Sequence, residues 1–232
     1  MDDSVLNLSS PGVRSVSEQV YEHLVRAIVE GALPPNQVLS DRALAHQLDV
    51  SRTPIREAFH QLESVGLVKR RSRIGWVVTD FTRRDVEELI ELRCVLEAAG
   101  IRQLVHWSDS RLHELCALFD GFEQPFDSET TAEYLSRDRE LHITIVNATG
   151  NSRIKEVYRY VELQIDRVRH FISYRAQSRV AESLEEHREI TRALARRDAS
   201  AAVAALDAHL LNVQHKFVDL LDAVSAAAAE RR

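Results

Sequence analysis

The sequence has little glycine and little proline, only 7 and 5 of its 232 residues. A β-rich fold needs these residues at its many turns, so their scarcity argues against a sandwich or a barrel. Alanine, leucine, arginine and glutamate, which are good helix formers, are abundant by contrast. The composition therefore predicts a mostly α-helical chain of one or two domains.

Cysteine is scarce too, and Cys94 and Cys116 form neither a CxxC pair nor a disulfide framework. No apolar run approaches the ~20 residues that span a bilayer. The N-terminus also lacks the basic and apolar layout of a secretion signal. We therefore expect a cytoplasmic protein with no membrane partner.

An excess of positive charge is missing from the chain as a whole, whose formal net charge is −6. The charge is unevenly distributed, however. Residues 42–79 contain seven basic and three acidic side chains, which gives this window +4 and the rest of the chain −10. A basic module joined to an acidic body is compatible with phosphate binding by the module alone.

The first third of the chain has the element order of a winged helix-turn-helix. A flexible leader over residues 1–14 precedes a helix near 15–30. Ser40 is a good N-cap for a second, short helix, and a third helix follows after a tight turn. Short apolar runs around Gly75 then predict a β-hairpin. We assign residues 15–80 to this domain.

Every long segment after Thr82 has helical periodicity. Thr82 and Asp85 match the capping box that opens a helix. Residues 81–226 are therefore expected to form an antiparallel all-helical bundle of about six helices, followed by a tail at 227–232. The expected helices cover residues 83–106, 109–121, 131–148, 152–176, 179–197 and 199–225.

The helix-turn-helix presents side chains suited to DNA. Arg52 and Arg56 lie one turn apart at the N-terminal end of its second helix, the end that enters the major groove in this motif. Arginine is well suited to bidentate contact with guanine or phosphate. Each arginine alone could simply solvate a helix face, but the combination predicts binding to double-stranded DNA. The candidate DNA-binding residues are Arg42, Ser51, Arg52, Thr53, Arg56, Arg71, Arg73 and Gly75.

Four residues of the helical domain have the spacing of a metal site. Asp138 and His142 are i and i+4 on one helix and share a face. His187 and His209 lie equally far from a predicted helix-hairpin turn near Asp198, so they can face each other. Three imidazoles and one carboxylate would suit a divalent metal ion such as Zn²⁺, Ni²⁺ or Mn²⁺. The alternative is that each histidine is a hydrogen-bonded core residue.

The segment Val20–Val78 resembles the DNA-binding domain of the GntR family of transcription regulators. The family's hallmark is matched from Leu48 to Ala58, where the sequence reads LDVSRTPIREA. Two departures are mild, because Asp49 stands where glycine is usual and Phe59 where leucine is usual. The resemblance implies a homodimer bound to an inverted-repeat operator.

The C-terminal segment is similar to the FCD-type effector domain of the FadR branch of that family. The matching residues are Asp138, His142, Gly150-Asn151, His187 and His209. By this resemblance the aspartate and the three histidines are metal ligands, and six helices favour the vanillate-regulator-like subgroup. The resemblance also implies that the effector is a small organic acid.

Arg93 is the candidate effector-binding residue. It lies with Leu92 and Leu96 on a helix expected to face the bundle, where it could clamp a second carboxylate of the acid. Glu97 follows one helical turn later, so an internal Arg–Glu ion pair is the alternative.

An enzyme is another class of protein that a three-histidine metal site would suit. The sequence lacks an HExxH motif, a glycine-rich phosphate loop and a GxSxG elbow, and no general base is evident. We therefore predict a transcriptional regulator controlled by an organic acid at a metal site. A metal-dependent enzyme and a helical adaptor without DNA binding are the alternatives.

Overall fold

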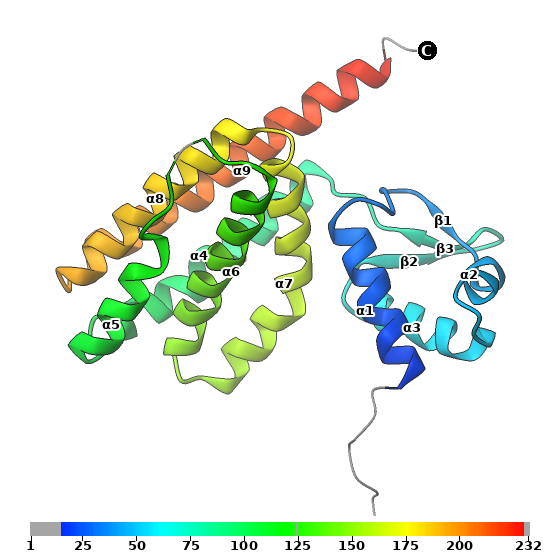
Figure 1. The fold of residues 1–232 in the computed structure, drawn as a ribbon, viewed down its shortest axis with the longest axis horizontal. Helices are drawn as coiled ribbons and strands as arrows, with labels where there is room; N and C mark the ends of the chain where they lie inside the picture. The colour runs from blue at the N-terminus through cyan, green and yellow to red at the C-terminus, as the bar shows by residue number, and fades with distance from the viewer. Residues whose placement is uncertain (1–14, 124, 230–232) are drawn as a thin grey trace, which may run out of the picture. The chain divides into compact units, whose positions relative to one another are not determined.

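The computed structural model describes residues 15–123 and 125–229, so the predicted leader at 1–14 lies outside the described residues. The chain divides into two compact units (Figure 1). One contains Ala32–Thr79 and the described residues up to Ile28, and the other contains Val29–Gly31 and the chain from Asp80 onward. Helices dominate, with one small sheet in the first unit, which confirms the predicted fold class.

Three helices form the body of the first unit: α1 (Val16–Val29), α2 (Asp41–Gln47) and α3 (Arg52–Ser64). α1 buries Val20, Leu24 and Ile28, which share one face because they recur every four residues. Ser40 caps α2 as expected, since its hydroxyl accepts a hydrogen bond from the Ala43 amide. The apolar stripe of α3 is fully buried, so its opposite face is left for charged side chains.

The sheet of the first unit has three strands rather than the two expected. β1 (Val38–Leu39), β2 (Val68–Arg71) and β3 (Gly75–Val78) form an antiparallel sheet in the order β1-β3-β2. The hairpin β2–β3 was predicted, but β1 was not. A two-residue strand has no periodicity to detect, and it exists only because its backbone pairs with Val77 and Trp76.

The turn between α2 and α3 has a strained residue. Asp49 has φ +52°, the left-handed region that favours glycine. The family resemblance places glycine at this position, and the backbone geometry explains why. Aspartate tolerates this conformation better than most other residues, so the turn survives the replacement.

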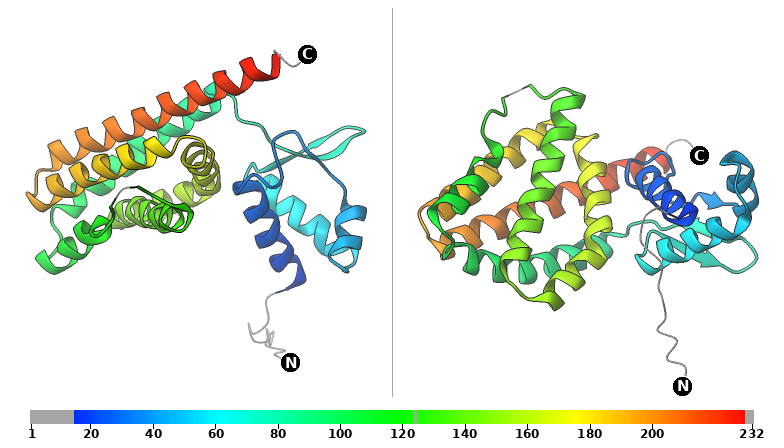
Figure 2. Two further views of the ribbon diagram at one scale, coloured as in Figure 1. Left: turned by 45° about the horizontal axis from the view of Figure 1, so that its top comes forward. Right: turned by 60° about the horizontal axis from the view of Figure 1, so that its bottom comes forward.

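In the described residues of the second unit there are six α-helices, as expected. They are α4 (Arg83–Leu104), α5 (Asp109–Cys116), α6 (Ser128–Ala148), α7 (Ser152–Ser173), α8 (Gln177–Ala195) and α9 (Ala199–Ala229). The capping box of Thr82 and Asp85 is present at the start of α4. A 3₁₀ turn (Ala117–Phe119) extends α5, and α9 runs into the predicted tail. Both views of Figure 2 show α8 and α9 side by side as a helical hairpin.

Helices α4 and α6 approach each other closely at Gly100. A Cβ atom added at this glycine would lie 1.9 Å from the carbonyl oxygen of Ile145. Only glycine fits here, although it weakens a helix interior by about 1 kcal/mol relative to alanine. This contact brings together α4 and α6, which carry Arg93 and His142 respectively.

The length and apolar character of the helices in the described residues bear on whether one of them could span a membrane. None of them is long and apolar enough to cross a bilayer.

Candidate functional sites

The recognition-helix arginines are exposed. Ser51 occupies the N-cap of α3, and Arg52 and Thr53 fall in the first turn. The side chain of Arg52 is 54% exposed and that of Arg56 is 57% exposed, so both are accessible to a duplex. Arg42, at the start of α2, is exposed as well. All five of these predicted residues are therefore accessible, although Ser51 and Thr53 line a different depression from Arg52 and Arg56.

A carboxylate that sequence reasoning missed joins the two arginines. Asp41 accepts hydrogen bonds from Arg52 Nη2, at 2.9 and 3.1 Å, and from Arg56 Nε, at 2.6 Å. Desolvation raises the pKa of Asp41, but the hydrogen bonds from Arg56 and Arg52 outweigh it, so the net pKa lies below the usual range. Asp41 is therefore ionised and holds both guanidinium groups.

The wing lies next to this arginine pair. An open depression is lined by both arginines, by Asp41 and by Arg70 and Gly75 of the hairpin. Arg71 and Arg73 are exposed, and Arg73 and Gly75 have φ +66° and +101° at the tip of the hairpin. Of the hairpin candidates, the structure thus brings Gly75 together with Arg52 and Arg56, whereas Arg71 and Arg73 lie outside the lining of this depression.

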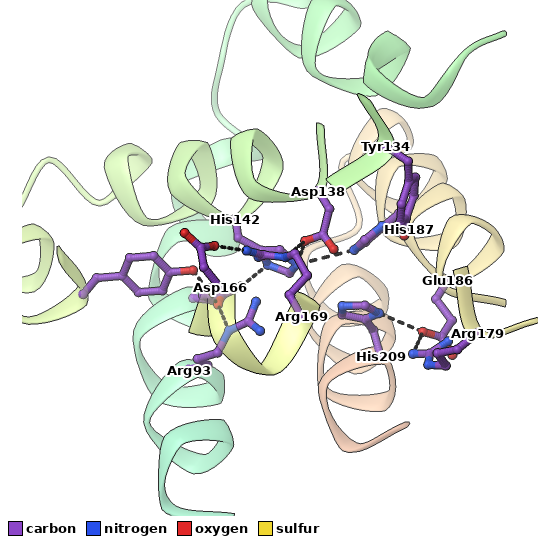
Figure 3. A network of polar contacts seen from close by, with 12 residues as sticks. Arg93, Tyr134, Asp138, His142, Asp166, Arg169, Arg179, Glu186, His187 and His209 are labelled. Atoms are coloured by element: carbon purple, nitrogen blue, oxygen red, sulfur yellow. Dashed lines mark hydrogen bonds and ion pairs between the residues drawn. The ribbon is translucent and has the colours of Figure 1, made fainter. Parts of the chain in front are cut away.

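The three candidate histidines of the second unit lie together inside the bundle. His142 on α6, His187 on α8 and His209 on α9 each offer a nitrogen, and these nitrogens lie within 4.8 Å of one another. All three are buried, at 0%, 0% and 2% exposure. The rings of His187 and His209 have centroids 4.3 Å apart, as the hairpin spacing predicts. Figure 3 shows the three imidazoles converging beside Asp138.

Each histidine has an outer partner at Nδ1. Glu97 Oε2 lies 2.5 Å from His142 Nδ1, Glu186 Oε2 lies 2.7 Å from His209 Nδ1, and the Tyr134 hydroxyl lies 2.9 Å from His187 Nδ1. A carboxylate next to Nδ1 keeps the proton on that nitrogen and leaves Nε2 as the lone-pair donor. Metal-binding histidines in proteins are usually held by such partners.

Asp138 completes the cluster. Its Oδ1 lies 3.4 Å from His142 Nε2 and 2.9 Å from Arg169 Nε. Desolvation raises the pKa of Asp138, but the charge of Arg169 is the first of the effects that outweigh it, so the net pKa is lowered. The aspartate is therefore a carboxylate beside His142, at the edge of the histidine cluster.

Two of the three histidines, His142 and His187, are held in the neutral form. Desolvation, and after it the charge of Arg93, brings the pKa of His142 well below its usual value. Desolvation and the nearby His209 and His142 do the same for the pKa of His187. A metal ion requires neutral imidazole, so burial has prepared these two side chains for coordination.

The donor set fits a metal ion in spacing as well as in chemistry. Two ligand atoms that lie ~2.1 Å from a tetrahedrally coordinated ion are about 3.4 Å apart. The Nε2 atoms of His142 and His187 are 3.4 Å apart, the same distance as from His142 Nε2 to Asp138 Oδ1. The three histidines could therefore hold a divalent ion, and Asp138 lies beside them at His142.

A small cavity of about 30 Å³ adjoins the cluster and is lined by Asp138, His209 and the arginines Arg93, Arg169 and Arg179. These arginines are 4%, 9% and 3% exposed. Within the described part of the chain, the buried nitrogens Arg93 Nη2, Arg179 Nε and Arg179 Nη1 have no hydrogen-bond partner. Buried donors without hydrogen-bond partners are rare in proteins, so these nitrogens are available to a polar ligand in the cavity.

The internal ion pair expected as the alternative for Arg93 is present, and the role of Arg93 in effector binding stays a prediction. Its Nε bonds to Glu97 Oε1 at 2.7 Å, which is the internal ion pair, while its Nη2 remains available to the cavity. Arg169 and Arg179 were not predicted. Arg169 falls on a stripe with the buried Ile165 and Ile172, and an arginine on such a stripe is a signal that sequence reasoning could have used.

The exposed basic helix-turn-helix and wing, joined to a helical bundle, define a class of protein: a DNA-binding transcriptional regulator. The family model of bacterial regulatory proteins of the gntR family matches residues 16–78, and that of the FCD domain matches residues 88–212. The chain belongs to the GntR family and contains an FCD domain.

Named relatives agree with this membership and are regulators rather than enzymes. The Nta operon transcriptional regulator of Aminobacter aminovorans is 30% identical over 198 residues, which cover 84% of this chain and 90% of that protein. The gluconate operon transcriptional repressor of Bacillus subtilis (strain 168) is 27% identical over 223 residues, 93% of this chain and 88% of that protein. A GntR transcriptional regulator from Rhodococcus sp. RHA1 has a TM-score of 0.72 at 27% identity, covering 89% of this chain and 99% of that one.

Proposed function

We propose that this regulator senses a small organic acid through a divalent metal ion, and that occupancy of the metal site controls its binding to operator DNA. The ligands of the ion are Asp138, His142, His187 and His209. The observation that carries the proposal is the outer partner at each of the three Nδ1 atoms, which leaves the Nε2 atoms for a common ion.

An acid is the effector class that the cavity favours. A metal held by four protein ligands keeps positions that a carboxylate can occupy, and Arg93 and Arg179 supply buried N–H groups without partners. The relative named for a gluconate operon is associated with such an acid. The cavity of about 30 Å³ has room for about one or two water molecules, so an acid must displace side chains or helices on entry. Such a displacement is what a sensor requires.

The DNA-binding half of the proposal uses α3 as the recognition helix. Arg52 and Arg56 contact base edges or phosphates, Ser51 and Thr53 contact phosphates, and the wing approaches a neighbouring groove with Arg71, Arg73 and Gly75. Arg42 holds the DNA backbone. A homodimer would present two such helices to an inverted repeat in the bacterial cytoplasm, where the operator DNA is found.

Metal analysis combined with a ligand screen tests the sensor. The purified protein is expected to retain a divalent ion, and a series of hydroxy acids, sugar acids and dicarboxylates is screened by thermal shift on metal-loaded and metal-stripped protein. At least one acid is expected to stabilise only the loaded form. Equal shifts in both forms, or no bound metal, would contradict the proposal.

Substitution of Arg52 tests the recognition helix. Arg52→Ala is expected to weaken binding to duplexes selected by the wild-type protein by roughly 10- to 100-fold, which is the range for losing one bidentate base contact. Its melting temperature and metal content should not change, because the side chain is exposed. Unchanged DNA affinity would show that another surface reads the operator.

A further inference from the structure

We infer that Asp41 is a specificity-determining residue: it holds the guanidinium groups of Arg52 and Arg56 in position to read bases and discourages their use on phosphates. The inference rests on the proposed role of these two arginines. Asp41 immediately precedes the basic segment at residues 42–79, and its negative charge would by itself oppose DNA binding.

The geometry of the contacts supports a positioning role. One carboxylate accepts from both arginines, and its side chain is only 19% exposed, whereas the arginines are more than half exposed. Asp41 is therefore the fixed member of the group. Arg56 bonds through Nε, so neither of its terminal nitrogens takes part in the contact. Those two nitrogens form the fork that pairs with O6 and N7 of guanine.

The contacts with Asp41 restrict the side-chain conformations of Arg52 and Arg56 before DNA binds, which lowers the entropy that these arginines lose on binding. A free arginine must lose rotamer entropy to hold one geometry on a base edge. Two arginines already tied to a common carboxylate have lost part of that freedom before DNA arrives. The saving in entropy applies only to arginine geometries that keep the contact with Asp41. It therefore favours base sequences that those geometries can contact over other sequences.

The charge of Asp41 acts in the same direction. Non-specific binding depends on contacts between basic side chains and phosphates. An ionised carboxylate between two arginines weakens their attraction to phosphate on any sequence. It thus lowers non-specific affinity, and specificity is the difference between the two affinities.

A comparison of two charge-neutralising variants tests this inference. Asp41→Asn and Glu57→Gln each remove one negative charge from the first unit, and Glu57 is an exposed residue of α3 next to Arg56. The full-length protein and both variants select duplexes from a randomised pool. Binding of each to the wild-type-selected duplex and to a scrambled duplex of equal composition is then measured by fluorescence anisotropy at several salt concentrations.

We expect Asp41→Asn to lower the ratio of specific to non-specific affinity by roughly tenfold and to flatten the base preference at the guanines that the arginines read. Glu57→Gln is expected to raise both affinities together and to keep the wild-type preference. An Asp41→Asn protein with wild-type preference and ratio would overturn the inference.

A second background separates positioning from folding. Arg56→Lys keeps the positive charge. A lysine, however, has a single ammonium group, so it cannot bond to Asp41 and also present two fixed donors to a base. In the Arg56→Lys background, we expect Asp41→Asn to lower the ratio of specific to non-specific affinity by at most half the factor seen in the wild type. An undiminished effect both in this background and with Arg52→Ala, or one matched by a fall in melting temperature, would show that Asp41 serves the fold of α2 instead. If Arg52→Ala and Arg56→Lys both leave binding intact, the recognition-helix assignment fails, independently of Asp41.

Discussion

The functional arginine candidates of the two units differ in their exposure to solvent. In the first unit, Arg52 and Arg56 are exposed and share one carboxylate at the surface. In the second, Arg93, Arg169 and Arg179 are buried, and each lies beside a carboxylate in the bundle interior. Exposed ion pairs add little stability, and buried ones are costly to maintain. The first arrangement keeps the two guanidinium groups accessible to DNA. Under the proposed function, the second arrangement presents buried guanidinium groups to a small acid.

The largest effect that this comparison predicts follows loss of a candidate metal ligand. His187→Ala is expected to weaken metal binding by more than the ~10- to 100-fold typical of losing an outer partner, because a ligand itself is removed. Metal affinity is measured by competition with a chelating dye, with helical content checked by circular dichroism. The exposed His113 of α5 provides the control, because His113→Ala should retain full affinity. A His187→Ala protein with wild-type affinity would show that the histidine cluster is only a core feature.

A backbone contact in the bundle predicts the next effect. Gly100→Ala should lower the free energy of unfolding by ~2–3 kcal/mol, since the new methyl group would clash with the Ile145 carbonyl. Helix propensity alone predicts the opposite sign, a gain of about 1 kcal/mol. Urea unfolding decides between them, and Ala99→Gly on the same helix gives the propensity effect without the clash. A stabilised Gly100→Ala protein would mean that α4 and α6 do not touch there.

The buried histidines predict a pH dependence that the exposed arginines do not share. Unfolded histidines take up protons near pH 6.5, whereas burial holds the pKa of His142 and His187 well below that value. The unfolded chain then binds more protons, so the stability of the metal-free protein should fall as the pH drops below 6.5, by up to ~1.4 kcal/mol per pH unit for each histidine. Unfolding curves at pH 7.5, 6.5 and 5.5 measure it. Equal stability at all three values would contradict the neutral assignment.

The smallest effect belongs to the turn before the recognition helix. Asp49→Gly should stabilise the first unit by about 0.5 kcal/mol, because glycine accepts φ +52° without strain. Asp49→Ala should destabilise it by about 1 kcal/mol for the opposite reason. Thermal unfolding followed by circular dichroism compares the two, and a stabilising alanine would indicate that the turn is not left-handed.

Local sequence patterns predicted most of the fold. The helices of both units follow from apolar spacing, and the capping residues Ser40 and Thr82 lie where the pattern requires them. The facing of His187 and His209 followed from their equal distance to a helix-hairpin turn. These features depend on residues near one another in the chain, or on a single simple hairpin.

Long-range pairing accounts for what was missed. Strand β1 exists only through its pairing with β3, and Asp41 has the appearance of an ordinary acidic residue in the first turn of a helix. Its partners Arg52 and Arg56 come from the next helix. Likewise, the contact between Arg169 and Asp138 joins α7 to α6. The periodicity of one segment does not show which side chains of a second segment the first segment will contact.

The central claim is that an acid bound at the metal site of the second unit changes DNA binding by the first. The most direct test titrates a fluorescent duplex, selected by the protein from a random pool, with metal-loaded and metal-stripped protein, each with and without an acid identified by thermal shift. We predict that the acid changes the Kd for DNA only in the metal-loaded protein. The same change in both forms, or no change in either, would contradict the account.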